Sequence, residues 1–100
     1  MSTRIDLYNE LKKACSNIYF DPPESLKMKY PCIVYSRDNS RTKYGDDKVY
    51  VYRQGYQVTV IDKNPDSLIP ESLLYSLSMI SFQREFVSDN LHHTVFQVYY

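Results

Sequence analysis

The sequence has no tryptophan, only two glycines, only two cysteines and no net charge over its 100 residues. With Gly45 and Gly55 alone, the glycine-rich loops that hold phosphate groups, such as GxGxxG and the P-loop, are absent. The 12 basic and 12 acidic side chains cancel, so no overall field attracts the chain to nucleic acid or to an anionic membrane. No apolar run approaches the ~20 residues of a membrane span, and we expect a protein that is soluble and intracellular when it is made.

The two cysteines, Cys15 and Cys32, have neither CxxC spacing nor a secretory signal before them. The N-terminus, MSTRIDLYNELKK, is charged and amphipathic where a signal peptide would be apolar. A disulfide would require an oxidising compartment. We therefore predict two reduced, buried thiols.

The residue types that usually carry catalysis or bind metals occur without a supporting pattern. Adjacent side chains of a strand point to opposite faces, so His92 and His93 cannot share one metal ion and are expected to be edge or interface histidines. The carboxylates of Asp46-Asp47 and of the stretch 62–71 fit turns and helix caps better than a catalytic cleft. No serine stands on a nucleophile elbow. The sequence predicts no catalytic residue, no metal site and no cofactor, and hence not an enzyme.

Apolar periodicity predicts the fold class. In the stretch 55–67, GYQVTVIDKNPDS, the residues Tyr56, Val58 and Val60 alternate with polar neighbours, which is typical of a central strand leading into a helix. The amphipathic segments on either side each have one apolar stripe, so two helices are expected to cover one face of a sheet. We predict an α+β two-layer sandwich, a mainly antiparallel sheet of four to five strands with two helices on one face, in the order α-β-β-β-α-β-β. The expected elements are a helix at about 3–15, a short extended piece at 18–20, strands at about 31–36, 48–53 and 56–62, a helix from about Pro70 to Leu77, and a hairpin of strands beginning near 82 and 91.

One domain, residues 1–100, is expected, with a long polar loop or hairpin tip at about 36–48. This region, SRDNSRTKYGDDK, has no apolar periodicity, and the positions 36–54 carry five basic and three acidic residues, whereas 55–100 carry two and five. Such an asymmetry would be complementary between neighbours in a head-to-tail assembly, but a solvated loop explains it equally well. Basic residues interleaved with tyrosines also leave open a small binding module that contacts nucleic acid or a protein partner through this loop.

Three segments in order resemble the tail terminator proteins of long-tailed bacteriophages and prophages, also described as tail completion or head-to-tail joining proteins. They are PPESLKMKYPCIVYSRDNSRTKYGDDKVYV, YQVTVIDKNPDSLIPESL and FVSDNLHHTVFQVYY, and the similarity runs from about Leu7 to Tyr100. Its most specific parts are 29–35, 58–62 with 65–67 and 69–70, and 89–93.

The resemblance implies an architectural role. Proteins of that family form a ring, usually a hexamer, which caps the head-proximal end of the tail tube, stops its polymerisation and presents the surface that joins the head. The implied partners are further copies of the chain, the tail tube protein and a head completion or connector protein, with DNA passing through the lumen without specific binding and no membrane contact. The implied location is the virion, after assembly in the host cytoplasm.

Exposure and pattern, rather than any family motif, select the candidate residues for subunit or tube contacts. Eleven tyrosines are many for 100 residues, and tyrosine suits both half-buried sheet positions and surfaces that become buried on assembly. The candidates are Arg37, Arg41, Lys43, Tyr44, Lys48, Tyr50, His92, His93, Tyr99 and Tyr100.

Overall fold

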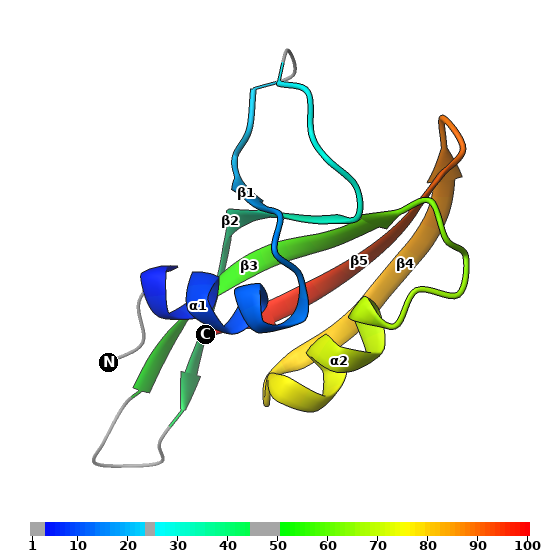
Figure 1. Cartoon of the computed structure of the whole chain (residues 1–100). Helices are drawn as coiled ribbons and strands as arrows, with labels where there is room; N and C mark the ends of the chain where they lie inside the picture. Colours follow the sequence, from blue (N-terminus) through cyan, green and yellow to red (C-terminus); the bar gives the residue numbers. More distant parts are fainter. Residues whose placement is uncertain (1–3, 24–25, 45–50) are drawn as a thin grey trace.

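The computed structural model describes residues 4–23, 26–44 and 51–100, and for 39–44 and 51–53 it describes the backbone alone. These residues form two helices and a five-stranded sheet, in the predicted order α-β-β-β-α-β-β (Figure 1). The elements are α1 (Arg4–Ala14), β1 (Ile18–Phe20), β2 (Cys32–Tyr44), β3 (Val51–Asp62), α2 (Ile69–Ser76), β4 (Ile80–Ser88) and β5 (Leu91–Tyr99).

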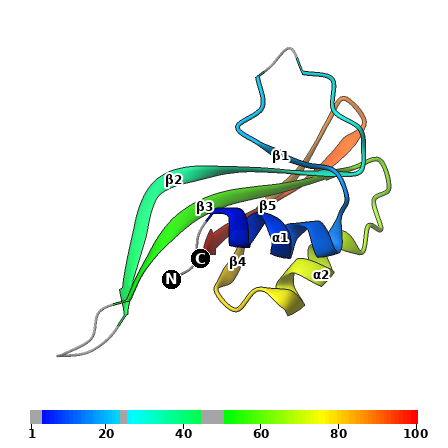
Figure 2. The same ribbon diagram turned by 60° about the vertical axis from the view of Figure 1, so that its left-hand side comes forward.

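The sheet has the strand order β1-β2-β3-β5-β4. Only β1 and β2 run parallel, and the other three neighbouring pairs are antiparallel. Both helices lie on the same face of the sheet, as Figure 2 shows in side view. The predicted α+β sandwich with a mainly antiparallel sheet is therefore confirmed.

The two helices cover the central strands with the apolar stripes that the sequence indicated. Leu7 and Leu11 of α1 and Leu73 of α2 are fully buried. They pack in one cluster with Tyr56, Val58 and other sheet residues of the same face, and complete burial of an aliphatic side chain of this size contributes about 1.5–3 kcal/mol. The rest of the cluster consists of Cys15, Ile33, Tyr35, Val60, Leu77, Phe96 and Val98.

Two expectations about the strands are wrong. The segments predicted as separate strands at 48–53 and 56–62 form, from Val51 onward, one continuous β3 that runs through Gly55. The irregularity lies instead on the partner strand, where the register shifts between Arg37 and Arg41. Three strands still precede α2, because the short extended piece at 18–20 is itself a strand, β1, and pairs with β2.

The polar stretch expected as a loop from 36 is strand up to Tyr44, and its remaining positions 45–48 lie outside the described residues. Because β3 pairs with it residue by residue from Arg41↔Gln54 to Tyr44↔Val51, backbone hydrogen bonding holds this part extended without an apolar pattern. The pairing between β3 and β5 ends at Gly55↔Tyr99. Beyond that point, the described part of the β2–β3 pair continues as a two-stranded arm (Figure 2).

Candidate functional site

Strand β4 forms one edge of the sheet and is largely open to solvent. Every residue from Ser81 to Ser88 is exposed, and within the described residues β4 pairs only with β5. An edge strand presents a row of backbone N–H and C=O groups to any further strand that approaches it. The nine-residue length of β4 makes this a much longer open edge than the three-residue β1 at the other side.

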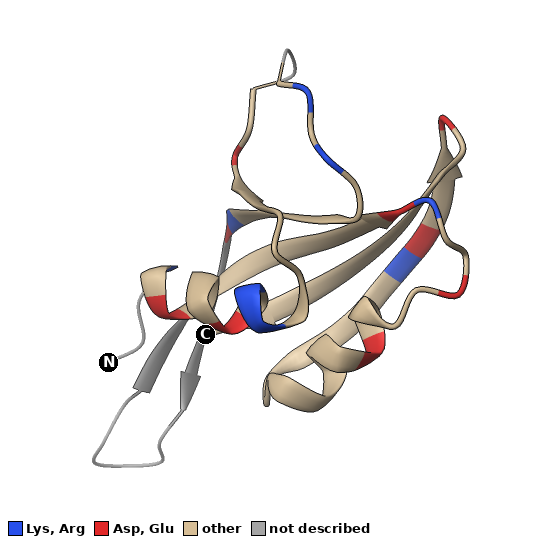
Figure 3. Ribbon diagram, viewed as in Figure 1, with Lys and Arg blue, Asp and Glu red and all other residues tan. Residues whose placement is uncertain are grey.

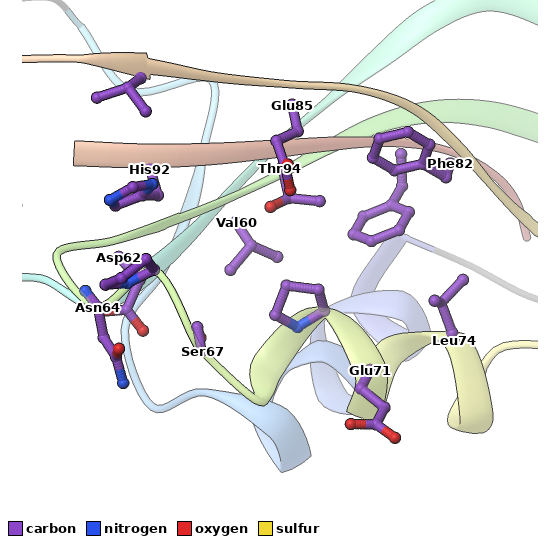
Figure 4. Close-up of a pocket in the computed structure, with 14 residues that line it drawn as sticks. Val60, Asp62, Asn64, Ser67, Glu71, Leu74, Phe82, Glu85, His92 and Thr94 are labelled. Carbon is purple, nitrogen blue, oxygen red and sulfur yellow. The ribbon is translucent and has the colours of Figure 1, made fainter.

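A groove of about 620 Å³ separates α2 from β4 (Figure 4). Its apolar lining includes Phe82, Val87 and Leu74, which remain 56%, 60% and 47% exposed. Val60 and Phe96 form the buried side of the same groove. Large apolar side chains that stay this exposed around one hollow are typical of a surface that a partner covers.

The charged residues of the groove are all acidic. Asp62 comes from the end of β3, Glu71 from the first turn of α2 and Glu85 from β4, and no lysine or arginine belongs to the described residues that line it. His92 of β5 lies in the same lining. A partner that fits this groove combines apolar side chains with basic ones.

The turn between β3 and α2 forms the end wall of the groove and is held by local hydrogen bonds. The N–H of Asn64 donates to Asp62 Oδ1 at 3.0 Å, and the N–H of Asp66 donates to Asn64 Oδ1 at 2.9 Å. Each is a side chain that binds the backbone two residues ahead, the geometry that favours Asp and Asn in turns. The Ile69 N–H donates to the Ser67 hydroxyl at 3.3 Å at the start of α2. Asp62 therefore has a structural role as well as its place in the groove.

The two histidines lie on opposite faces of the sheet, as predicted. His92 lines the groove on the helix-covered face, whereas the ring of His93 stacks on Phe86 on the open face, with centroids 4.6 Å apart and planes 9° from parallel. Arg84 lies over the same Phe86 ring at 5.7 Å. Within the part of the chain that is described, no three His, Cys, Asp or Glu side chains gather as a metal site would require.

The other predicted contact residues fall at the opposite end of β5 or on the arm. Arg37 is exposed on β2, just before the register shift. Tyr99 is half-buried and faces Gly55, and the Tyr100 N–H donates to the Gln54 carbonyl at 3.1 Å, where the arm leaves the sheet. Arg41, Lys43 and Tyr44 lie in the part of β2 for which the backbone alone is described. Lys48 and Tyr50 lie outside the described residues.

The base of the arm is joined to β5 by side-chain hydrogen bonds. Gln97 Nε2 donates to Asp38 Oδ2 at 2.7 Å, and Gln54 Nε2 donates to the Asp38 carbonyl at 2.7 Å. Gln83 of β4 in turn donates to Gln97 Oε1 at 3.2 Å. These contacts link four strands near the point where β2 is irregular, and so they help to set the direction in which the arm leaves the sheet.

Sequence reasoning missed the groove, although a signal for it was present. The second helix region contains Leu68, Ile69, Leu73, Leu74 and Leu77, more large apolar residues than one buried stripe of an eight-residue helix needs. Leu73 and Leu77 are buried, while Leu68 and Leu74 remain 72% and 47% exposed. Of these two, Leu74 lines the groove, so the surplus of leucines was the signal for it.

Both cysteines are free and buried, as predicted. The Cys15 thiol donates to the Pro31 carbonyl at 3.4 Å, so it lies beside the residue that precedes Cys32. Burial, with smaller contributions from Cys15 and Asp62, raises the pKa of Cys32 to about 12. A thiol with this pKa stays protonated and unreactive at neutral pH.

Comparison with models of known protein families and with curated protein sequences finds no match. Among the described residues, neither helix has the length or the apolar character needed to cross a membrane.

Proposed function

We propose that the chain is a structural subunit of a ring at the head-proximal end of a bacteriophage tail tube. In this role it terminates polymerisation of the tube and provides the surface to which the head joins. Its partners are further copies of itself, usually six in such rings, together with the tail tube protein and a head completion or connector protein. DNA passes through the lumen without specific binding, and the assembled ring is part of the virion.

The observation that carries the proposal is the open edge strand β4 with exposed apolar residues beside it. Phe82, Val87 and Leu74 surround the groove between β4 and α2, and nothing within the described chain covers them. A closed ring is made by heterologous contacts, in which one surface of a subunit meets a different surface of the next. An apolar groove beside an open β edge is suited to one half of such a contact. The three segments that resemble tail terminator proteins support the same role.

Electron microscopy of phage particles made without this protein tests the proposal. We expect tubes of irregular, excessive length and filled heads without tails, because nothing ends the tube or joins it to the head. Tails of normal length that still join heads would refute the assignment.

Complementation with point variants extends this test to the groove. Val87→Glu places a charge on the exposed apolar rim, and we expect it to fail in restoring normal particles. Ile5→Glu is the matched control, because Ile5 of α1 is 61% exposed, like Val87 at 60%, but does not line the groove. We expect Ile5→Glu to restore normal tails, and equal behaviour of the two variants would contradict the placement of the contact.

A further inference from the structure

We propose that the acidic groove between α2 and β4 receives the segment Leu26–Tyr30 of the next copy of this chain. The inference deepens the proposed function, on which it rests, by naming both halves of the contact between neighbouring ring subunits. It concerns two surfaces of the same chain that are complementary in charge and polarity.

The segment Leu26–Tyr30 belongs to no helix or strand and leads directly to Pro31 and the start of β2. Leu26 is 41% exposed, and both Lys27 and Lys29 are exposed. Two backbone N–H groups of the segment donate hydrogen bonds: the Leu26 N–H to the Pro23 carbonyl at 3.0 Å, and the Lys29 N–H to the Tyr19 side-chain hydroxyl at 3.2 Å. It thus presents an apolar side chain and two cations on a backbone that is already positioned.

The groove offers the complementary chemistry. Its carboxylates, Asp62, Glu71 and Glu85, come from three different elements, and the described lining includes no basic residue. The sequence from Leu26 to Tyr35, LKMKYPCIVY, has two lysines and no acidic residue. Three carboxylates facing two lysines give a favourable and strongly salt-dependent attraction.

Apolar contacts can accompany the charges. Both surfaces place apolar side chains beside charged ones. In the segment Leu26 precedes Lys27, and on β4 Phe82 and Val87 are near Glu85 in the sequence. An exposed leucine that enters the groove loses its contact with water, as do the exposed faces of these two residues. Apolar burial provides affinity, while the lysine and carboxylate pairs fix the register of the two copies.

The segment and the α2–β4 part of the groove belong to different parts of the sheet. The segment belongs to the connection between β1 and β2 and ends just before Cys32, which pairs with Ile61 beside Asp62. Glu85 lies on the edge strand β4, two strands further along the sheet from β3. Figure 3 shows two basic positions on the second half of that connection, after an acidic one near β1. It shows acidic positions on α2, on β4 and at the end of β3, with a basic position beside each of the last two. Figure 2 shows this connection on the side of the sheet away from both helices, whereas α2 forms one wall of the groove on the helix-covered face. A contact between the two surfaces is therefore made head to tail between copies, which is the arrangement that closes into rings. This is why a second copy, rather than an unrelated basic peptide, is the occupant that we infer.

Charge reversal tests the pairing. The variant Lys27→Glu/Lys29→Glu and the variant Glu71→Lys/Glu85→Lys each put like charges at the contact, and we expect each to weaken self-association about tenfold or more in sedimentation velocity at low salt. The variant that carries all four changes restores opposite charges and should recover the parent's association to within about threefold. Asp62 is left unchanged because it holds the turn before α2.

The matched control is Lys12→Glu/Lys13→Glu, which reverses two exposed lysines on α1 without touching either surface. It should associate like the parent. Circular dichroism and thermal unfolding of every variant establish that the fold is retained. The mixture of the two weakened variants is a further test. The reversed segment of one variant is opposite in charge to the reversed groove of the other, so we expect the mixture to associate where either variant alone does not.

Cross-linking locates the contact directly. Lys27→Cys and Glu85→Cys are made in separate chains of a background in which Cys15 and Cys32 are replaced by alanine, and the mixed chains are oxidised. We expect a disulfide-linked dimer from the mixture and much less from either chain alone or from a Lys12→Cys and Glu85→Cys mixture.

Several outcomes would overturn the inference. Reversed variants that associate like the parent, a four-change variant that stays dissociated, or the absence of the mixed disulfide would each do so. A parent protein that remains monomeric even at millimolar concentration would do so as well. The proposed function fails separately, if particles without the protein have normal joined tails. A ring that forms with the charge variants unaffected removes the inference alone.

Discussion

The Cys32 thiol makes the stability of this protein depend on pH in the alkaline range. Its side chain is fully buried at the start of β2, and burial is the main reason that its pKa is raised from 9.0 to about 12. Negative charge at Cys15 and Asp62 adds to the effect. In the unfolded chain, water surrounds the thiol and its pKa returns to its ordinary value.

The direction of the effect follows from proton binding in the two states. Between about pH 9 and pH 12 the folded protein keeps the thiol proton, whereas the unfolded chain has lost it, so a rising pH favours unfolding. The full contribution of Cys32 is therefore present below about pH 9 and declines above it. The expected decline in the free energy of unfolding is about 1.4 kcal/mol for each pH unit in this range.

Urea unfolding of the parent and of Cys32→Ala measures the decline. Other groups titrate in the same range, so the quantity of interest is the difference between the pH slopes of the two proteins, taken at about pH 8 and about pH 10. Loss of the sulfur lowers the stability of Cys32→Ala by a constant amount at both values, but its slope should be shallower. Cys15→Ala, which also removes a buried sulfur, should retain most of the parent's slope. Equal slopes for the parent and Cys32→Ala would refute the reasoning.

Two further predictions concern the core. Tyr35→Phe should raise the free energy of unfolding by about 1 kcal/mol, because the buried Tyr35 hydroxyl has no hydrogen-bond partner within the described structure. If urea unfolding shows instead that the free energy of unfolding falls by a similar amount, the hydroxyl makes a hydrogen bond in the folded protein and the prediction is wrong. Leu73→Ala should lower the free energy of unfolding by about 2–5 kcal/mol, and the adjacent Leu74→Ala by well under half of that, because Leu73 is fully buried and Leu74 is 47% exposed. Similar losses at the two positions in thermal or urea unfolding would contradict the orientation of α2.

The helices and the final hairpin could be predicted because their signals are local. Leu7 and Leu11 stand four apart on one face of α1, and the proline at position 70 fits only the first turn of α2. The pair Asp89-Asn90 occupies positive φ values of 53° and 62°, which these residue types tolerate well, and thereby turns β4 into β5. Each signal needs only a few neighbouring residues, so it can be read along the chain.

The extent of β2 and β3 could not be predicted, because it depends on partners that are distant in sequence. Gly55 indicated a break, yet it lies buried within β3, paired with Tyr99. The polar residues up to Tyr44 have no strand pattern of their own, and their extension comes from pairing with Val51 and the residues that follow it. In both places hydrogen bonds between strands outweigh the local preference.

The sequence by itself determined the fold class, the opposite orientation of His92 and His93, and the burial of the two thiols, since side-chain periodicity and polarity fix these properties. Only the tertiary structure decided that Asp62, Glu71 and Glu85 share one groove, and that this groove opens beside the edge strand β4. The strand order β1-β2-β3-β5-β4 places β4 last, at an open edge, although it precedes β5 in the chain. Spatial neighbours of this kind arise from sheet topology, which local periodicity does not specify.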